Sequence, residues 1–139
     1  MGSGLIKPEW KQKWVTALRS GEYKQGFRGV LKDAMGNYCC LGVLEYLVLK
    51  EHPEIATRYE CPVGKDGVIG LSLPIPLVAD FVTVDTFPNR EEARNPGIEV
   101  TEEDRVKYKI TLSGPVPLAV LNDNLMPFTK LADLIEAQL

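Results

Sequence analysis

The sequence contains little of what disulfide scaffolds and zinc domains are built from. It has three cysteines, Cys39, Cys40 and Cys61, and a single histidine, His52. An odd cysteine count argues against a disulfide framework, and neighbours such as Cys39 and Cys40 rarely bond each other because the geometry is strained. A structural zinc site needs several ligands at recognisable spacing. We therefore expect neither a metal nor a cofactor.

The sequence also lacks a long apolar run and an excess of positive charge. No run approaches the roughly 18 residues of a membrane span, and the N-terminus has no apolar signal core. The net charge is −3 and the sequence pI is about 5.2, whereas a protein that binds duplex nucleic acid normally carries a basic face. We expect a cytoplasmic protein whose partners include neither a membrane nor a nucleic-acid duplex.

What the sequence does contain is the composition of one ordinary globular domain. The chain has 139 residues, of which 45% are hydrophobic and 25% are charged. A domain of this length buries enough surface to fold without a covalent staple. We expect residues 1–7 to be a flexible tail or a cloning scar, and residues 8–139 to form a single α+β domain.

Three segments have the apolar spacing of helices. The first begins at Pro8 and ends at the glycine C-cap Gly21. The second is the apolar run 38–50, where length and spacing favour a helix from residue 40, with residues 38–39 completing a hairpin. The third opens at Pro127, and its apolar stripe comprises Phe128, Leu131, Ala132, Ile135 and Leu139.

Between these helices the sequence predicts strands and turns. Residues 30–32 read as a short strand followed by a turn at 33–37. Strand composition recurs at 68–73 and 77–84, and alternation at 106–112 predicts another strand. Residues 86–104 predict a polar, exposed loop with a helical piece at 90–94. We expect a compact α+β fold in which three helices pack on a small, mostly antiparallel sheet.

The basic loop 23–29 is the first candidate binding site. Its two glycines let backbone amides approach an anion closely. Arg28 can form a forked contact with a phosphate or carboxylate, and Lys24 adds positive charge. Tyr23 can stack on a base, and Gln25 can recognise an amide or a base edge. The alternative is a plain helix-to-strand connection, in which the glycines serve turn geometry and the aromatic residues pack.

The short polar stretch 122–124 is the second candidate. It lies between an apolar segment and the last predicted helix. Asn122 and Asp123 could present acceptors and an amide to a ligand beside the helix N-terminus. The alternative is that they cap the helix, which is a common role of these residue types.

Cys39 and Cys40 are the first candidates for nucleophilic chemistry; Cys61 lies closer to His52 in sequence, but nothing in the sequence orients that pair. A reactive cysteine needs a lowered pKa, which a helix N-terminus or a histidine can provide. His52 lies about 18 Å further along the predicted helix, too far to pair with them locally. The alternative is that both are small core residues, as free cysteines usually are. We assign no catalytic residue.

Three blocks of the sequence occur together in a recognisable order. They are LRSGEYKQGFRGVLKD, NYCCLGVLEYL and LNDNLMPFTKLADLIEAQL. Over residues 10–47 and 118–136 the chain resembles a group of small accessory proteins of bacteriophages and prophages. The resemblance implies a setting in the host cytoplasm, where such proteins often act on host systems by binding. It brings no catalytic residues with it.

The resemblance and the candidate sites together predict a counter-defence protein that binds and sequesters a small anionic ligand such as a nucleotide immune signal. We expect a homo-oligomer, because clefts between subunits make ready binding sites. Two alternatives stay open: an inhibitor that covers a host protein through residues 86–104 and exposed helix faces, and a cysteine-dependent enzyme. The predicted ligand contacts are Tyr23, Lys24, Gln25, Arg28, Asn122 and Asp123.

Overall fold

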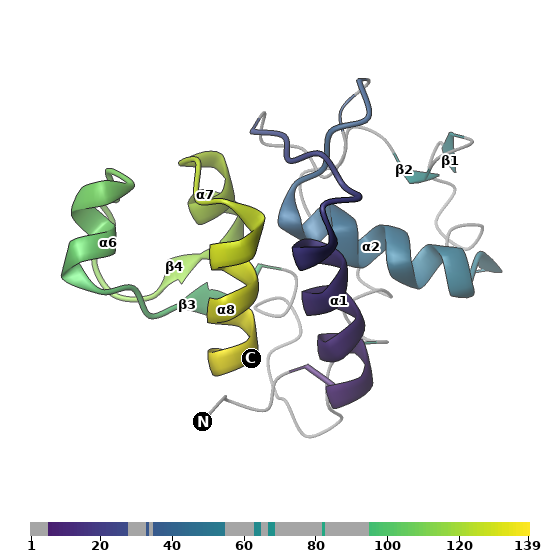
Figure 1. The fold of residues 1–139 in the computed structure, drawn as a ribbon, viewed down its shortest axis with the longest axis horizontal. Coiled ribbons are helices and arrows are strands. Elements are labelled where there is room, and N and C mark those ends of the chain that lie inside the picture. The colour runs from purple at the N-terminus through teal and green to yellow at the C-terminus, as the bar shows by residue number, and fades with distance from the viewer. Residues whose placement is uncertain are drawn as a thin grey trace.

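A computed structural model of the protein describes residues 6–27, 33, 35–54, 63–64, 67–68, 82 and 95–139, with the backbone alone for 63–64 and 67–68. Within these residues the chain forms five helices and four short strands (Figure 1). The helices are α1 (Pro8–Ser20), α2 (Cys40–Glu51), α6 (Glu102–Lys107), α7 (Leu118–Asp123) and α8 (Phe128–Gln138). The strands are β1 (Val63–Gly64), β2 (Gly67–Val68), β3 (Gly97–Ile98) and β4 (Val116–Pro117).

Helix α1 begins and ends where the sequence predicts. Pro8 occupies the first turn, where its missing N–H costs no hydrogen bond. The helix ends at Gly21, whose φ of 79° lies in the left-handed region that favours glycine. The buried face consists of Trp10, Trp14, Val15 and Leu18. Pro8 and Gly21 therefore predicted the ends of the helix.

Helix α2 forms over the apolar run that predicted it. The run is apolar almost all round because α2 is a central helix, packed against both α1 and α7. Ahead of it, Tyr38 makes a parallel bridge with Gln25, while residues 30–32, the other strand of the predicted hairpin, lie outside the described residues. The buried residues of α2 are Cys40, Leu41, Gly42, Val43, Leu44, Glu45, Val48 and Leu49.

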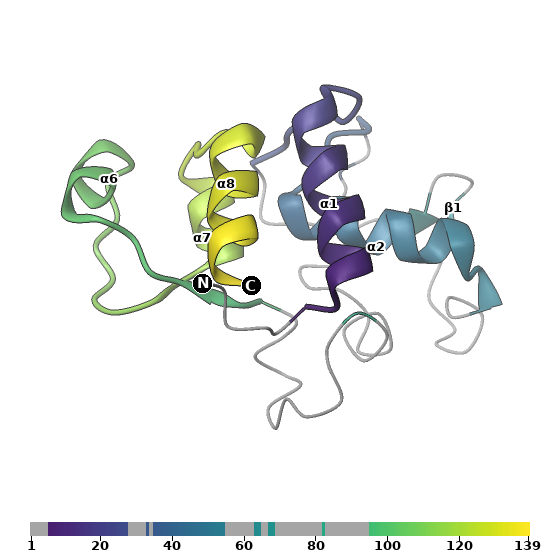
Figure 2. The ribbon, with the colours of Figure 1, turned by 60° about the horizontal axis from the view of Figure 1, so that its bottom comes forward.

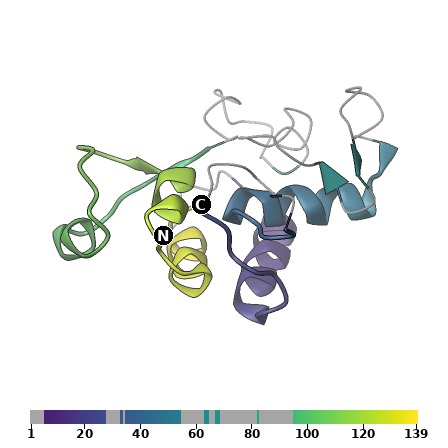
Figure 3. The same ribbon diagram turned by 90° about the horizontal axis from the view of Figure 1, so that it is seen from above.

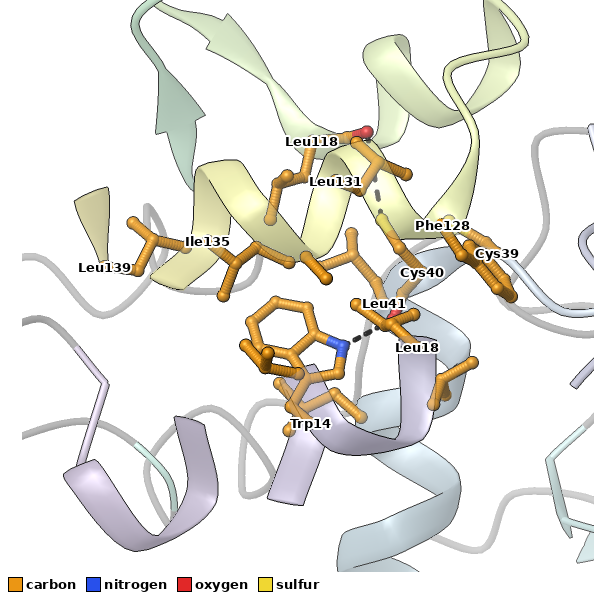
Figure 4. Packing of buried hydrophobic residues seen from close by; sticks show 14 of the residues in the cluster. Trp14, Leu18, Cys39, Cys40, Leu41, Leu118, Phe128, Leu131, Ile135 and Leu139 are labelled. Atoms are coloured by element: carbon orange, nitrogen blue, oxygen red, sulfur yellow. Dashed lines mark hydrogen bonds between the residues drawn. The ribbon is translucent and has the colours of Figure 1, made fainter. Parts of the chain in front are cut away.

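Helices α1 and α8 lie side by side and form the most extensive contact between elements (Figures 1 and 2). Trp14 is fully buried at their junction with α2, and its indole Nε1–H donates a hydrogen bond of 2.9 Å to the Cys40 carbonyl (Figure 4). On the outside, Arg19 of α1 pairs with Asp133 at 2.7 Å and with Glu136 at 2.9 Å. A buried indole thus links α1 to α2 by a hydrogen bond, and an exposed ion-pair cluster links α1 to α8.

Strands β3 and β4 pair in antiparallel register and form the base of an excursion, residues 99–115, which we call the arm. Figures 1 and 3 show α6 in the arm at the end of the molecule opposite α2. No residue of α6 is buried. The arm is closed by Arg105, which donates to the carbonyls of Leu112 and Gly114, and is tied to α8 by a 3.2 Å ion pair between Lys130 and Asp104.

The predicted strand at 106–112 is wrong. Residues up to Lys107 continue helix α6, and no strand is present in the rest of that stretch. The Thr101 side chain accepts a hydrogen bond from the Asp104 N–H, and three acidic residues fill the first turn of the helix. Lys109 then has a φ of 54°, which ends any regular continuation. The N-terminal capping signal therefore overrode the alternating pattern.

The structure confirms a mixture of helices and antiparallel strands, but the prediction of three helices is wrong, since the described residues contain five. The additional ones, α6 and α7, each have six residues, too few for helical periodicity to show in the sequence.

In the described part each sheet has only two strands. The predicted strand at 30–32, most of those at 68–73 and 77–84, and residues 86–94 of the predicted loop lie outside the described residues. In the described part of that predicted loop, Ile98 of strand β3 is fully buried and is therefore not exposed as predicted.

No helix in the described ranges is long and apolar enough to span a membrane. The described chain starts at Ile6, which is buried and donates its N–H to the Leu139 carbonyl at 3.1 Å. This hydrogen bond joins the two ends of the described chain.

Candidate functional site

The two sequence segments predicted to bind a ligand lie next to each other in the structure. The Gln25 side-chain Nε2 donates a 3.0 Å hydrogen bond to Oδ1 of Asn122, although the residues are 97 positions apart. Segment 24–27 therefore runs beside segment 122–126. The sequence named both segments but gave no indication that they touch.

Gln25 uses its whole side-chain amide within the protein. Besides Asn122, its Nε2 donates to the Met126 carbonyl at 2.7 Å, and its Oε1 accepts the Phe128 N–H at 3.1 Å. Phe128 opens α8, and the residue that precedes it, Pro127, provides no capping side chain. Gln25 thus caps α8 from a distant part of the chain.

Asn122 is fully buried and is equally engaged. Its Oδ1 also accepts the Cys40 N–H at 3.2 Å, where α2 begins. Its Nδ2 donates to the Gly26 carbonyl at 2.8 Å and to Oδ1 of Asp123 at 3.3 Å. We call Gln25 and Asn122 together the amide knot. It links segment 24–27 with the starts of α2 and α8.

Glycine is required at position 26 because the turn at 33–37 packs closely against its Cα. A Cβ atom at this position would lie 2.9 Å from the Cβ of Asn37 and 3.4 Å from Oδ2 of Asp33. The facing turn at 33–37 forms as predicted. The Asp33 carboxylate holds it by accepting the N–H groups of Met35 at 2.9 Å and Asn37 at 3.0 Å. In the described part of the loop, the glycine serves packing.

Tyr23 belongs to a cluster of three part-buried tyrosines. Its ring centroid lies 5.4 Å from that of Tyr38 and 5.9 Å from that of Tyr46, both in edge-on contact. Burial, with a smaller contribution from Tyr46, raises the pKa of Tyr23. The ring is therefore neutral at physiological pH and is held in place by its neighbours.

An open groove of about 630 Å³ lies between α1 and α2, and Tyr23 lines it. Its apolar lining also includes Trp10, Ala17 and Leu47. Its charged lining comprises two lysines and two glutamates, Lys13, Lys50, Glu22 and Glu51. Lys13 bridges to Glu51 across the groove at 3.0 Å, and its Nζ lies 4.5 Å from the ring centroid of Trp10. We call this the α1–α2 groove.

The remaining predicted contacts differ in how far the structure describes them. Lys24 is exposed, and its carbonyl accepts the Tyr38 N–H at 2.7 Å. Asp123 is partly exposed beside the amide knot. Arg28 lies outside the described residues. Among the described residues there is no group of three or more His, Cys, Asp or Glu side chains that could hold a metal ion.

Cys39 and Cys40 both lie in the core. Cys39 is the residue before α2 and is 4% exposed, while Cys40 opens the helix and is fully buried (Figure 4). Burial raises the pKa of Cys40, whereas a hydrogen bond with Cys40 lowers the pKa of Cys39. His52 lies at the other end of α2, where it contacts Glu54 at 3.2 Å. Neither thiol is placed to meet a substrate in this conformation.

Comparison with known proteins assigns the sequence to a family. Residues 6–139 match the family described as Domain of unknown function (DUF8296). The chain belongs to this family. No curated protein and no solved structure is significantly similar to the chain. The groove and the amide knot both lie within the residues matched to DUF8296.

Sequence analysis missed most of the α1–α2 groove. Trp10, Leu47 and Lys50 lie in segments that the sequence predicts as helices, and no sequence motif marks them as parts of a site. Helical spacing carried a usable signal, because Lys13 and Ala17 fall one turn apart on the face of α1 next to the buried stripe. What it lacked was the relative position of α1 and α2, which only packing determines.

Proposed function

We propose that the protein is a phage-type accessory protein that acts by binding, and that it sequesters a small anionic ligand, such as a nucleotide immune signal, in the α1–α2 groove. The resemblance to phage and prophage accessory proteins supports the counter-defence setting. The groove geometry supports a small ligand. Host cytoplasm is the compartment in which such a signal would be met.

The observation that carries this proposal is the position of Tyr23 in the groove. Its ring is fixed by edge-on contacts with Tyr38 and Tyr46 and lies beside Leu47. A fixed aromatic ring next to an apolar floor suits a flat heterocycle. The volume of about 630 Å³ lies within the range of small-molecule sites, roughly 300–1,000 Å³.

The charges of the groove favour a ligand with a compact anionic group. Lys50 stands at its rim in the last turn of α2. Lys13 is held by an exposed ion pair with Glu51, which an anion can replace at little cost because exposed pairs contribute little. Glu22 and Glu51 oppose an extended polyanion. The proposed ligand is therefore a heterocycle carrying phosphate at one end.

The predicted contacts divide into two groups under this proposal. Tyr23 stacks on the ligand, with Lys24 and Arg28 supplying charge from the adjoining segment. Gln25 and Asn122 act through the amide knot by holding that segment in place, and Asp123 lies beside them. Of the six sequence-predicted residues, Tyr23 lines the groove itself, which is the proposed binding surface.

Titration calorimetry with a panel of cyclic and linear nucleotides tests the proposal. A bound nucleotide should lose roughly tenfold or more in affinity with Lys50→Ala, in keeping with a charge-assisted hydrogen bond. Tyr23→Leu should weaken binding by a similar factor through lost stacking. Lys107→Ala, a lysine in the arm, is the matched control and should bind normally. A folded protein that binds none of the panel would contradict the proposal.

The alternative, an inhibitor of a host protein, has its own supporting observation. Val106 is 74% exposed and Leu112 is 46% exposed, both in the arm that projects from the body. Replacing residues 102–113 with a short glycine–serine linker separates the two functions. Under the lead proposal nucleotide binding survives this replacement. Under the alternative, binding to the host protein is lost while the body stays folded.

A further inference from the structure

Leu125 occupies a backbone position that usually belongs to glycine. Helix α7 ends with two hydrogen bonds of 3.2 Å, from the Leu125 N–H to the Asn122 carbonyl and from the Met126 N–H to the Leu121 carbonyl. This pair defines a Schellman motif, in which the residue after the cap is left-handed and is most often glycine. Leu125 has a φ of 72°. Its Cβ makes that conformation strained.

The left-handed backbone serves the end of α7 through these two hydrogen bonds, but glycine would serve it without strain, and the leucine side chain adds no internal packing. Leu121 and Met126, on either side of the motif, are fully buried, whereas the Leu125 side chain is 64% exposed. A strained backbone and an exposed leucine are both unfavourable in an isolated chain. Strain of this kind persists mainly at positions with a function. The side chain of Leu125 is therefore an exposed apolar group that packing within the chain does not explain.

A second exposed apolar residue lies on the adjoining segment. Phe27 is 43% exposed. Its segment, 24–27, is fastened to segment 122–126 by the bond from Asn122 Nδ2 to the Gly26 carbonyl, 2.8 Å, and by the bond from Gln25 to the Met126 carbonyl, 2.7 Å. In Figure 1 the loop after α1 and the turn between α7 and α8 lie together along the upper edge.

The charges on these two segments identify the occupant. Lys24 is exposed on one segment, and Asp123 is partly exposed on the other. A two-fold axis would lay segment 24–27 of one copy on segment 122–126 of another. Each Lys24 would then meet an Asp123, and each Phe27 a Leu125. A patch that carries both charges and two apolar residues is complementary to itself.

We infer that Lys24, Phe27, Asp123 and Leu125 form the contact between two copies of this chain in a two-fold dimer. The α1–α2 groove is a separate surface that shares none of these four residues. Lys24 and Asp123 are also among the predicted ligand contacts, so Leu125 tests the dimer, whereas Tyr23 and Lys50 test the ligand site.

Sedimentation velocity over a concentration series tests the dimer with Leu125→Gly. The wild-type protein should sediment as a dimer, and the variant should dissociate at least tenfold more readily. The same variant should raise the thermal midpoint of the monomer, because glycine relieves the strained backbone. Opposite changes in association and monomer stability are the expected signature. A variant that dimerises like the wild type overturns the inference, and so does a wild-type protein that is monomeric at high concentration.

Charge reversal tests the two-fold arrangement by a second route. Lys24→Glu should weaken the dimer, and adding Asp123→Lys should restore it, since the opposite charges then meet again. Failure of the double variant to restore association overturns the arrangement. Val106→Ser, which removes an exposed apolar residue from the arm, is the control and should leave the dimer unchanged. Nucleotide binding by Leu125→Gly then reports on the groove alone.

Discussion

At the scale of single residues, the centre of the candidate site is held by side-chain amides. An amide offers two donors and two acceptor positions, so one buried asparagine can satisfy several backbone groups at once. Asn122 does this for Cys40 and Gly26, which lie 82 and 96 positions away. Gln25 does the same for Phe128. Gln25 and Asn122, which the sequence predicts as ligand contacts, therefore fix the geometry of segment 24–27.

Replacing Asn122 with alanine should destabilise the protein strongly. The change leaves the Cys40 N–H and the Gly26 carbonyl without their partner, and such groups are costly to bury unpaired. We expect the free energy of unfolding to fall by about 3 kcal/mol in urea denaturation. Asn124→Ala, in the same turn, is the control, since that side chain makes none of these bonds. Equal losses for the two variants would contradict the role of the amide knot.

At the scale of elements, the arm shows how a helix can form without burying anything. Helix α6 has six residues and no buried side chain, and an isolated helix of that length is unstable in water. Its Thr101 cap, the acidic first turn and the two carbonyl contacts of Arg105 replace the missing packing. Local hydrogen bonds therefore determine the shape of the arm.

Arg105→Ala should open the arm and leave the body intact. Without the guanidinium, the carbonyls of Leu112 and Gly114 lose the contact that closes the excursion. We expect amide hydrogen exchange over residues 102–114 to accelerate roughly tenfold, while α1 and α8 keep their protection. Lys107→Ala in the same helix should change little. Unchanged exchange in the arm of the Arg105 variant would show that other contacts hold it.

Helix α1 makes a buried hydrogen bond to α2 and exposed ion pairs to α8, and these contribute very differently to stability. Trp14→Phe removes the buried indole N–H and leaves space in the core, and should lower the free energy of unfolding by about 2–3 kcal/mol. Arg19→Ala removes only exposed ion pairs and should leave stability nearly unchanged. Chemical denaturation of both variants decides this. A larger loss for Arg19→Ala would reverse the assignment.

At the scale of the whole molecule, one core connects the four helices α1, α2, α7 and α8. Cys39 and Cys40 lie inside it, and the sulfur of Cys40 approaches the Leu118 carbonyl of α7 at 4.0 Å (Figure 4). A reagent can reach these thiols only when the core opens. Thiol chemistry therefore reports on global opening and distinguishes core cysteines from a catalytic one.

In a Cys61→Ser background, the two remaining thiols should react with a maleimide at least a thousandfold more slowly in the native protein than in urea. The rate should follow the free energy of unfolding, because global opening exposes both groups together. A destabilised variant such as Asn122→Ala should accordingly label faster. Rapid stoichiometric labelling of native protein would contradict the core assignment and support the cysteine-enzyme alternative.

The sequence alone determined the long helices and drew attention to the two segments that meet in the amide knot. The apolar spacing, Pro8, Gly21 and Pro127 predicted α1 and α8, because those signals act within a few residues. The composition also predicted a mixed fold with free cysteines. Local patterns failed at 106–112, where alternating residues belong to a capped helix and a loop that no sheet supports.

Only the tertiary structure decided what the candidate residues do. Packing brought Gln25 to Asn122 and so used their amides inside the protein, and it placed α1 beside α2 to form the groove. It also set Leu125 outward in a strained turn. These outcomes depend on contacts between residues tens of positions apart, and the free energy of such contacts is fixed by the packed chain as a whole, which no local pattern records.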